Sequence, residues 1–327
     1  MRSALPKVLH RLCGRPMLGH VLALADLLAP QRTVVVLSPQ TLDQVQAAFG
    51  GHYTYVPQAE RLGTGHAVLQ AREALGGREG QVLVLFGDTP LVRAETAQTL
   101  LQAQHAAGSL VGVLSFQSDP PTGYGRIVRN AAGQVEALVE ERDATPEQRA
   151  ITEVNAGVMC FDAGWLWEQI DRIPLNRHKH EYYLTDLVAM AVGQRGPGAV
   201  VAVQAADPSE AWGINNRAQL AQAEQELRRR INQVLMESGV TMVDPASTYV
   251  DADASVGADT TLLPGTMLRG RTTVGAGCTI GPHAELVDVR VGDQARVSFA
   301  VVEGGEIAAG ARIGPFEHIS NGRKLRG

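Results

Sequence analysis

One carboxylate stands where a parallel sheet would present it to a ligand. In "LVLFGDTPL", Asp88 follows an apolar strand-like run and a glycine, and it precedes a proline that ends the strand. Parallel sheets bind ligands at the carboxyl ends of their strands, where a carboxylate can reach a phosphate-bound Mg²⁺. A turn aspartate or a helix N-cap has the same setting. This segment by itself leaves the metal and the turn interpretations open.

A pair of glycines marks a second candidate site, in "QAERLGTGHAV". Gly63 and Gly65 flank Thr64, and a helix-like stretch follows. Glycine lets a backbone approach a ligand closely, and the free N–H groups at a helix start can bind a base edge or a phosphate. Many strand–helix turns share this pattern, so it is a weak indication of a nucleotide loop.

Polar residues beside small ones occur in "PTGYGRI", "EVNAGV" and "EYYLTD". Asn155 lies between an apolar run and Gly157, and Glu140 lies in "LVEERDA". Each side chain can hydrogen-bond a sugar hydroxyl or an amide, and each also suits ordinary turn chemistry. None of the nine histidines stands in a nucleophile motif with a serine or cysteine, and none forms a pair with metal-ligand spacing.

The elements that must position these residues alternate along roughly the first 215 positions. Short apolar runs at 33–38, 81–88 and 109–116 are typical of buried strands, and the stretches 64–75 and 94–107 are typical of helices. Such alternation predicts an α/β domain with a mostly parallel, Rossmann-like sheet. From 216 to about 238 the spacing of Leu220, Leu227, Ile231 and Leu235 predicts one long amphipathic helix.

Beyond the helix the aliphatic residues recur every six positions. A six-residue period predicts a β-helix of about eighteen residues per coil, with the aliphatic side chains stacked inward and roughly four coils between 250 and 319. The phase slips near Val291. The residues in question are Val250, Val256, Leu262, Leu268, Val274, Ile280 and Leu286, then Val297, Val302, Ile307, Ile313 and Ile319.

Composition narrows the function classes. The chain has 327 residues and a net charge of -5, without the basic clusters of a nucleic-acid-binding protein. Its three cysteines form no CxxC pair, which favours reduced thiols in the cytoplasm. No apolar run is long enough to span a membrane, and no signal peptide is visible at Met1.

The motifs taken in order resemble one family. "LPKVLHRLCGRPML", "QAERLGTGHAV", "FGDTPL", "TGYGRI", "VEERDA", "EVNAGV", "EYYLTD" and "GINNR" are similar to the bifunctional N-acetylglucosamine-1-phosphate uridylyltransferase / glucosamine-1-phosphate acetyltransferase of bacterial cell-wall precursor synthesis. The resemblance runs from Met1 to about Phe316. It implies a nucleotidyltransferase domain at 1–215, a linker helix at 216–240 and a left-handed hexapeptide-repeat β-helix at 241–327.

The resemblance also implies a reaction and a set of residue roles. The sugar phosphate, N-acetylglucosamine 1-phosphate, would attack the α-phosphorus of UTP and release pyrophosphate. Such a transfer needs in-line positioning and charge neutralisation rather than a side-chain nucleophile. The implied roles are phosphate contact for Lys7, uracil binding for Gln58, Gly63 and Thr64, Mg²⁺ binding for Asp88 and Asn215, and sugar binding for Gly125, Glu140 and Asn155. The resemblance also implies a homotrimer that forms through the β-helix.

The sequence departs from the family pattern at both ends. The family opens with a strand and a loop of the form LAAGxGTRM, and Met1 falls on the last residue of that loop. The coils that carry the acetyltransferase residues would follow Phe316, and His283 and His318 match no catalytic position. We therefore expect no acetyl transfer, uridylyl transfer weaker than with the loop restored, and a weakened trimer.

Three functions stay open at this point. The chain can be a uridylyltransferase, an impaired fragment with weak substrate binding, or a β-helix oligomerisation module beside a passive α/β domain. The motifs favour the first, and the missing N-terminal loop favours the second. A pyrophosphate-release assay separates them.

Overall fold

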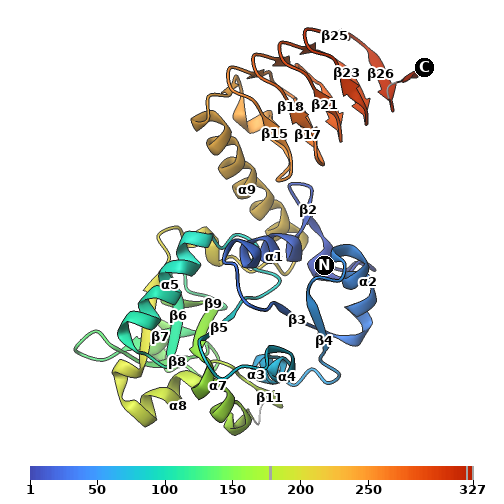
Figure 1. The fold of residues 1–327 in the computed structure, drawn as a ribbon. Helices are drawn as coiled ribbons and strands as arrows, with labels where there is room; N and C mark the ends of the chain where they lie inside the picture. Colours follow the sequence, from blue (N-terminus) through green and yellow to red (C-terminus); the bar gives the residue numbers. More distant parts are fainter. Residues whose placement is uncertain (177–178, 322, 326–327) are drawn as a thin grey trace. The chain divides into compact units, whose positions relative to one another are not determined.

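The computed structural model describes residues 1–176, 179–321 and 323–325, and it divides into two compact units (Figure 1). The α/β unit comprises Arg2–Leu9 and Met17–Gly213. The β-helix unit comprises Met1, His10–Pro16 and the chain from Ile214 onward. The sequence predicts a single boundary at 215/216, whereas in the structure the short segment His10–Pro16 also belongs to the unit that contains the β-helix.

A six-stranded sheet forms the centre of the α/β unit, in the order β12-β6-β9-β7-β8 with β5 also paired to β9. β6 and β12 run parallel, whereas β9 is antiparallel to β5, β6 and β7. Two further strands, β3 and β4, form a separate parallel pair. The strands of the unit are β3 (Val34–Leu37), β4 (Thr54–Pro57), β5 (Gln81–Val84), β6 (Val111–Gln117), β7 (Arg126–Arg129), β8 (Val135–Val139), β9 (Glu153–Asp162), β10 (Leu175–Asn176), β11 (Glu181–Tyr182) and β12 (Val200–Gln204).

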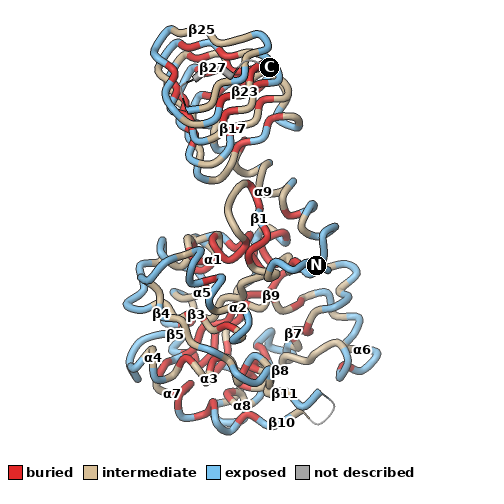
Figure 2. Tube along the Cα trace, turned by 90° about the vertical axis from the view of Figure 1, so that its right-hand side faces the viewer, coloured by how far each residue is buried: buried red, intermediate tan, exposed pale blue. Residues whose placement is uncertain are grey.

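Helices cover both faces of the six-stranded sheet. Val111 and Val113 of β6 enter one core with side chains of α7 and α8, while Leu114 and Phe116 enter another with α5. Figure 2 shows these buried segments inside the unit. The helices are α1 (Met17–Leu27), α2 (Pro39–Phe49), α3 (Thr64–Gln70), α4 (Arg72–Leu75), α5 (Ala94–Ala107), α6 (Pro146–Arg149), α7 (Ala163–Gln169) and α8 (Asp186–Arg195). The α/β class is thus confirmed, with β3, β5, β6, α3–α4 and α5 where the apolar pattern predicts them.

The second unit is a stack of coils with three flat faces. Each face is a parallel ladder, and the three ladders are β13-β16-β19-β22-β25, β14-β17-β20-β23-β26 and β15-β18-β21-β24. The aliphatic residues predicted to point inward all belong to the core of this stack. The strands are β13 (Thr241–Met242), β14 (Tyr249–Val250), β15 (Ser255–Val256), β16 (Thr261–Leu262), β17 (Met267–Arg269), β18 (Thr273–Val274), β19 (Thr279–Ile280), β20 (Glu285–Val287), β21 (Arg290–Val291), β22 (Arg296–Val297), β23 (Ala300–Glu303), β24 (Glu306–Ile307), β25 (Arg312–Ile313), β26 (Glu317–Ser320) and β27 (Arg323–Leu325).

The strand register explains the phase slip near Val291. Leu268 pairs with Leu286, 286 − 268 = 18 residues along the chain, but Leu286 pairs with Val302, only 302 − 286 = 16 residues along. The later coils are therefore shorter than the expected eighteen residues. The aliphatic side chains of the shorter coils still point inward: Val291 and Val302 are both buried in the core of the stack.

Removing one methyl group from the middle of this core should destabilise the β-helix unit measurably. Ile280 is fully buried (0% exposed), so Ile280→Val should cost about 0.5–1.5 kcal/mol of unfolding free energy. The matched change Ile319→Val lies at the last coil, where the side chain is only partly buried, and should cost less. Urea unfolding followed by circular dichroism measures both, and equal costs would contradict the inward stacking at Ile280.

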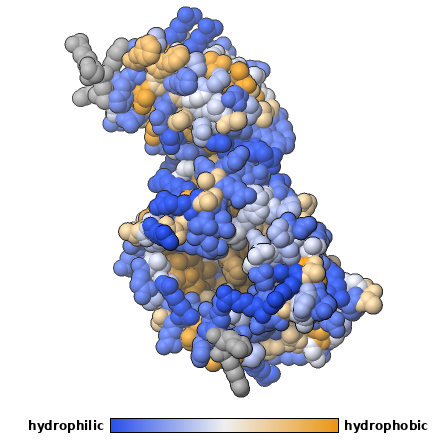
Figure 3. Space-filling view, turned by 180° about the vertical axis from the view of Figure 1, so that it is seen from behind, coloured by the Kyte–Doolittle hydropathy of each residue, from blue (hydrophilic) through white to orange (hydrophobic). Residues whose placement is uncertain are grey.

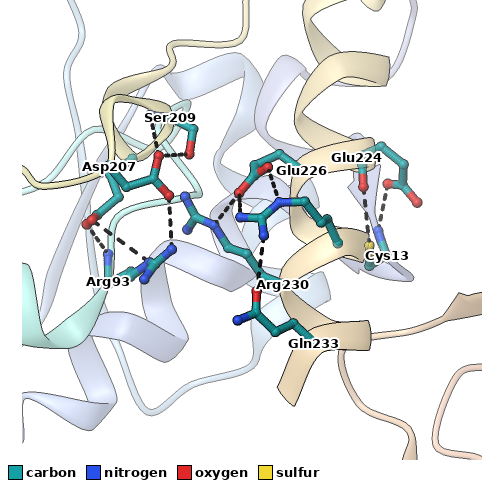
Figure 4. A network of polar contacts seen from close by, with 10 residues as sticks. Cys13, Arg93, Asp207, Ser209, Glu224, Glu226, Arg230 and Gln233 are labelled. Atoms are coloured by element: carbon teal, nitrogen blue, oxygen red, sulfur yellow. Dashed lines mark hydrogen bonds and ion pairs between the residues drawn. The ribbon is translucent and has the colours of Figure 1, made fainter. Parts of the chain in front are cut away.

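A hairpin near the N-terminus packs against α9 (Arg217–Glu237) and the first coil within the β-helix unit. Its strands β1 (Arg11–Leu12) and β2 (Arg15–Pro16) flank Cys13, whose backbone N–H donates to Glu224 of α9 at 2.7 Å (Figure 4). The carbonyl of Cys13 accepts from the N–H of Ala252 at 2.9 Å. Burial raises the pKa of the Cys13 thiol well above its usual range, so this cysteine is a neutral packing group rather than a nucleophile.

Long apolar helices are missing from the part of the chain that the structure describes. No described helix is long and apolar enough to cross a membrane.

Candidate active site

Lys7 and Asp88 lie together in the α/β unit. Lys7 opens a 3₁₀ turn, Lys7–Leu9, and its Nζ lies 2.6 Å from Oδ2 of Asp88. The next residue, Val8, packs against Gly87, where an added Cβ would lie 3.3 Å from Cγ1 of Val8. Both charged side chains are about one-third exposed (33% and 31%), so a ligand can reach them. The last residues of the sequence motifs "LPK" and "FGD", Lys7 and Asp88, are therefore in direct contact.

The structure decides one of the alternatives for Asp88. The following helix, α5, takes Arg93 as its N-cap residue, so Asp88 is not a helix cap. It lies instead in a turn closed by the N–H of Thr89, which donates to the carbonyl of Phe86 at 3.2 Å. Its carboxylate faces an ammonium group rather than the backbone, which leaves it suited to a charged ligand.

The predicted nucleotide residues also lie together. The side-chain amide of Gln58 donates through Nε2 to the carbonyl of Gly63 at 3.0 Å. Gly63 has a φ of 100° and abuts the backbone of Tyr182, where an added Cβ would lie 2.6 Å from the carbonyl oxygen. Only glycine fits that conformation and that approach. The hydroxyl of Thr64 accepts from the N–H of Leu184 at 3.0 Å, so Thr64 positions the loop.

The predicted sugar residues form a third group of neighbours. The carbonyl of Gly125 accepts from the N–H of Asn155 at 2.8 Å. A Cβ added to Gly125 would lie 3.6 Å from Oε1 of Glu140, so the carboxylate passes directly over this glycine. A register shift between β6 and β9 falls beside Asn155, and such bulges re-aim side chains. Oδ1 of Asn155 accepts from the N–H of Gly157 at 2.9 Å; among the described residues no hydrogen bond of its Nδ2 group is found, so Nδ2 can donate to a ligand.

One segment joins the nucleotide and sugar groups. In Glu181–Asp186, Tyr182 N–H donates to the carbonyl of Leu62 at 2.7 Å, and Thr185 Oγ1 donates to Oε1 of Glu140 at 3.2 Å. The segment thus touches the glycine loop at one end and the sugar carboxylate at the other. The sequence motif "EYYLTD" pointed to this segment, but neither Thr185 nor Asp186 was assigned a role from the sequence.

Negative charge is concentrated beside Glu140. Burial raises the pKa of Glu140; Asp143 adds to the rise, and the Thr185 hydroxyl and Lys179 oppose it. Burial, together with the charges of Glu140 and Asp143, raises the pKa of Asp186 to about 6. These carboxyl groups therefore hold protons more tightly in the folded chain than in an unfolded one.

This arrangement predicts a pH dependence of stability. Because the folded pKa of Asp186 is raised, its favourable contribution is complete below pH 4 and is lost as the pH rises through 6. Relative to Asp186→Asn, the parent should lose about 1 kcal/mol of unfolding free energy between pH 4 and 7, allowing for solvent screening of a half-exposed group. Urea titrations at several pH values measure this, with Glu95→Gln in the first turn of α5 as control. A constant difference between parent and Asp186→Asn across that range would contradict it.

The two proposed metal ligands belong to different units. Asp88 lies in the α/β unit, whereas Asn215 belongs to the β-helix unit, so their meeting at one ion stays a prediction. Locally, Asn216 rather than Asn215 caps α9, through Oδ1 to the N–H of Gln219 at 2.9 Å. Within the described residues no group of three His, Cys, Asp or Glu side chains could hold a metal alone. Two oxygen ligands from protein suit an ion that also binds phosphates and water, as Mg²⁺ does.

The surface of the α/β unit is hollowed on one face. Figure 3 shows a recess whose floor is apolar and whose rim is hydrophilic. A small-molecule site needs an apolar enclosure with a few polar groups. An open hollow of about 350 Å³ lies on the β-helix, beside exposed Phe316 and His318, and none of the predicted site residues lines it.

The α/β fold and the comparisons with known proteins identify the chain as a nucleotidyltransferase. A family model described as the MobA-like NTP transferase domain matches residues 1–156. The proteins called bifunctional protein GlmU are similar over nearly the whole chain. That of Halalkalibacterium halodurans is 45% identical across 98% of this chain and 70% of its own length, that of Trichlorobacter lovleyi 44% across 100% and 71%, and that of Enterococcus faecalis 39% across 98% and 69%.

The chain belongs to the GlmU family. It is a uridylyltransferase of UDP-N-acetylglucosamine synthesis, a class of enzyme that uses a divalent metal ion.

Proposed function

We propose that the α/β unit transfers UMP from UTP to N-acetylglucosamine 1-phosphate through the three residue groups described above. The observation that carries this assignment is the segment Glu181–Asp186, which contacts the glycine loop through Tyr182 and the sugar carboxylate through Thr185. A transferase must hold two substrates side by side, and a shared segment fixes the distance between their sites. The β-helix and its linker helix, 241–327 and 216–240, are proposed as separate domains.

The mechanism assigns work to each group. The sugar-phosphate oxygen attacks the α-phosphorus of UTP as the bond to the β-phosphate oxygen breaks, and pyrophosphate leaves. Lys7 is positioned to neutralise charge on the phosphates, while Gln58, Gly63 and Thr64 hold the uracil ring. Gly125, Glu140 and Asn155 orient the sugar so that its phosphate lies in line. Asp88 and Asn215 would hold Mg²⁺, which supplies a Lewis acid and a template for the triphosphate.

Glu140 and Asn155 supply complementary hydrogen bonds to the sugar. The carboxylate of Glu140 accepts, and the Nδ2 hydrogens of Asn155 donate, because its Oδ1 is engaged by Gly157. Hydroxyl groups can both donate and accept, so the pair can read two positions of one sugar ring.

Replacing Asn155 by alanine should weaken binding of the sugar phosphate without affecting binding of UTP. We expect the KM for the sugar phosphate to rise about 5- to 10-fold, the loss of one or two hydrogen bonds, with little change in the KM for UTP. Pyrophosphate release, measured with each substrate varied in turn, tests this. Asn130→Ala, in the turn after β7, serves as a control. A rise confined to the KM for UTP would place Asn155 in the wrong group.

The β-helix unit is proposed to associate as a trimer. The rings of Phe299 and Phe316 lie beside each other, tilted by 40° with centroids 5.9 Å apart, and both side chains are exposed (41% and 86%). Exposed aromatic groups are typical of association surfaces. Light scattering over a concentration series measures the state, and a monomer at all concentrations would rule it out. The family resemblance also supports a cytoplasmic location.

A further inference from the structure

A histidine behind the nucleotide loop faces the side chain proposed to contact uracil. Nδ1 of His66, in α3, lies 3.2 Å from Nε2 of Gln58, and Nε2 of the same ring lies 3.1 Å from Nε2 of Gln70. His66 and Gln70 are partly buried and neither belongs to the proposed contacts with substrate. The inference below rests on the proposed role of Gln58.

The carbonyl of Gly63 fixes which way the Gln58 amide points. That oxygen accepts both the N–H of Ala67 at 3.1 Å and the Nε2 hydrogens of Gln58 at 3.0 Å. A carbonyl oxygen can only accept, so the amide atom beside it must be the nitrogen. Turning the amide over would bring two oxygen atoms face to face. Gly63 itself is held by its close approach to the backbone of Tyr182.

The same logic fixes the proton on His66. With one Nε2 hydrogen of Gln58 on Gly63, the other points to Nδ1 of His66, which must then accept. A neutral imidazole that accepts at Nδ1 carries its proton on Nε2. The structure has Nε2 of Gln70 beside that N–H, so the Gln70 amide must be turned over, oxygen for nitrogen, for the hydrogen bond to form. With the Gln70 amide turned, every donor in the network faces an acceptor.

The consequence appears at Oε1 of Gln58. Both hydrogens of Nε2 are engaged inside the protein, and among the described residues no hydrogen bond to Oε1 is found. The outward group of this side chain is therefore an acceptor only. A pyrimidine ring with a hydrogen on N3, as in uracil, can donate to it. Cytosine presents a lone pair at N3, which would face the oxygen unfavourably.

We infer that His66 is a positioning residue for base selectivity: it holds the Gln58 amide so that its oxygen selects a pyrimidine triphosphate carrying N3–H over one carrying an N3 acceptor. The backbone supports this geometry, because the N–H of Gln58 donates to the carbonyl of Leu37 at 2.7 Å, at the end of the β3–β4 pair. Hydrogen bonds therefore hold Gln58 both at its backbone, through Leu37 of β3, and at its side-chain amide, through Gly63 and His66.

Two substitutions of His66 distinguish positioning from packing. Asparagine can place an acceptor oxygen near the position of Nδ1, whereas the longer glutamine places its amide near Nε2 and leaves the Gln58 hydrogen unpaired. We measure kcat/KM with UTP and with CTP, using N-acetylglucosamine 1-phosphate as acceptor. His66→Gln should lower the UTP/CTP ratio about 3- to 10-fold, the value of one hydrogen bond, while His66→Asn should keep it within about 2-fold. Equal ratios for both variants would overturn the inference.

Gln58→Ala separates this inference from the proposed function. If Gln58→Ala leaves the UTP/CTP ratio unchanged, the assignment of Gln58 to the base is wrong. If Gln58→Ala lowers the ratio and His66→Gln does not, only the role of His66 is wrong. The tautomer gives a test without activity: nitrogen NMR of the histidine-labelled chain should show the His66 proton on Nε2. A proton on Nδ1 would contradict the network even if a variant failed to fold.

Discussion

Lys7→Met should reduce the rate of uridylyl transfer by about 10²–10³-fold while leaving the fold almost unchanged. A preorganised donor that meets charge developing in the transition state contributes roughly 3–4 kcal/mol. The ion pair of Lys7 with Asp88 is partly exposed, and such a pair contributes only about 0–1 kcal/mol to stability. Pyrophosphate release at saturating substrates measures the rate, and urea unfolding measures the stability.

The chain offers a matched control for Lys7→Met. Arg72 pairs with Asp171 at the same 2.6 Å distance, and Arg72 is about as exposed as Lys7 (34% and 33%). Arg72→Met should therefore change stability by a similar small amount and leave the rate within about 2-fold of the parent. If Lys7→Met and Arg72→Met lower the rate equally, Lys7 has no special contact with phosphate.

Asp88→Asn should have an effect of similar size with a different signature. The carboxylate is proposed as a ligand of Mg²⁺, and a bound metal contributes several kcal/mol of charge stabilisation. We expect a fall of about 10²-fold or more at saturating Mg²⁺ and a clear rise in the Mg²⁺ concentration needed for half the activity. Asp171→Asn is the control, because it breaks the comparable ion pair with Arg72. An unchanged Mg²⁺ requirement would remove Asp88 from the metal site.

The double variant shows whether Lys7 and Asp88 act together or separately. If each contacts a different substrate group, the free-energy losses of the two single changes should add in Lys7→Met/Asp88→Asn. If the pair matters only through its own ion pair, the double variant should be no slower than either single variant. The 2.6 Å contact makes this a direct comparison of structural and catalytic roles.

The β-helix could be predicted because its aliphatic residues recur at a regular period over most of its length. Each inward aliphatic, such as Leu262 or Leu268, belongs to a repeat whose phase is independent of the rest of the chain. The lengths of the later coils could not be predicted, because the pairing of each coil with the previous one decides which turn is shorter by a residue. Val291 and Val302 stay inward because the ladder register is kept.

The antiparallel strand β9 and the docking of the N-terminal hairpin show the opposite case. β9 reads as an apolar run, and only its partners β5, β6 and β7 decide its direction. Cys13 likewise gains its place through Glu224, 211 positions away. Contacts of that separation have no local signature. The candidate site residues were predicted from a family resemblance and from strand-end position, whereas His66 and Thr185 needed the geometry of their partners.

The most direct test of the account is the structure of this chain with UDP-N-acetylglucosamine and Mg²⁺ bound. The account predicts the uracil ring against Gln58 and Gly63, the sugar between Gly125, Glu140 and Asn155, and the metal ion in contact with Asp88 and Asn215. Lys7 should have moved its ammonium group from Asp88 to a phosphate oxygen. A product bound in the reverse orientation, or bound on the β-helix unit, would contradict the proposed site.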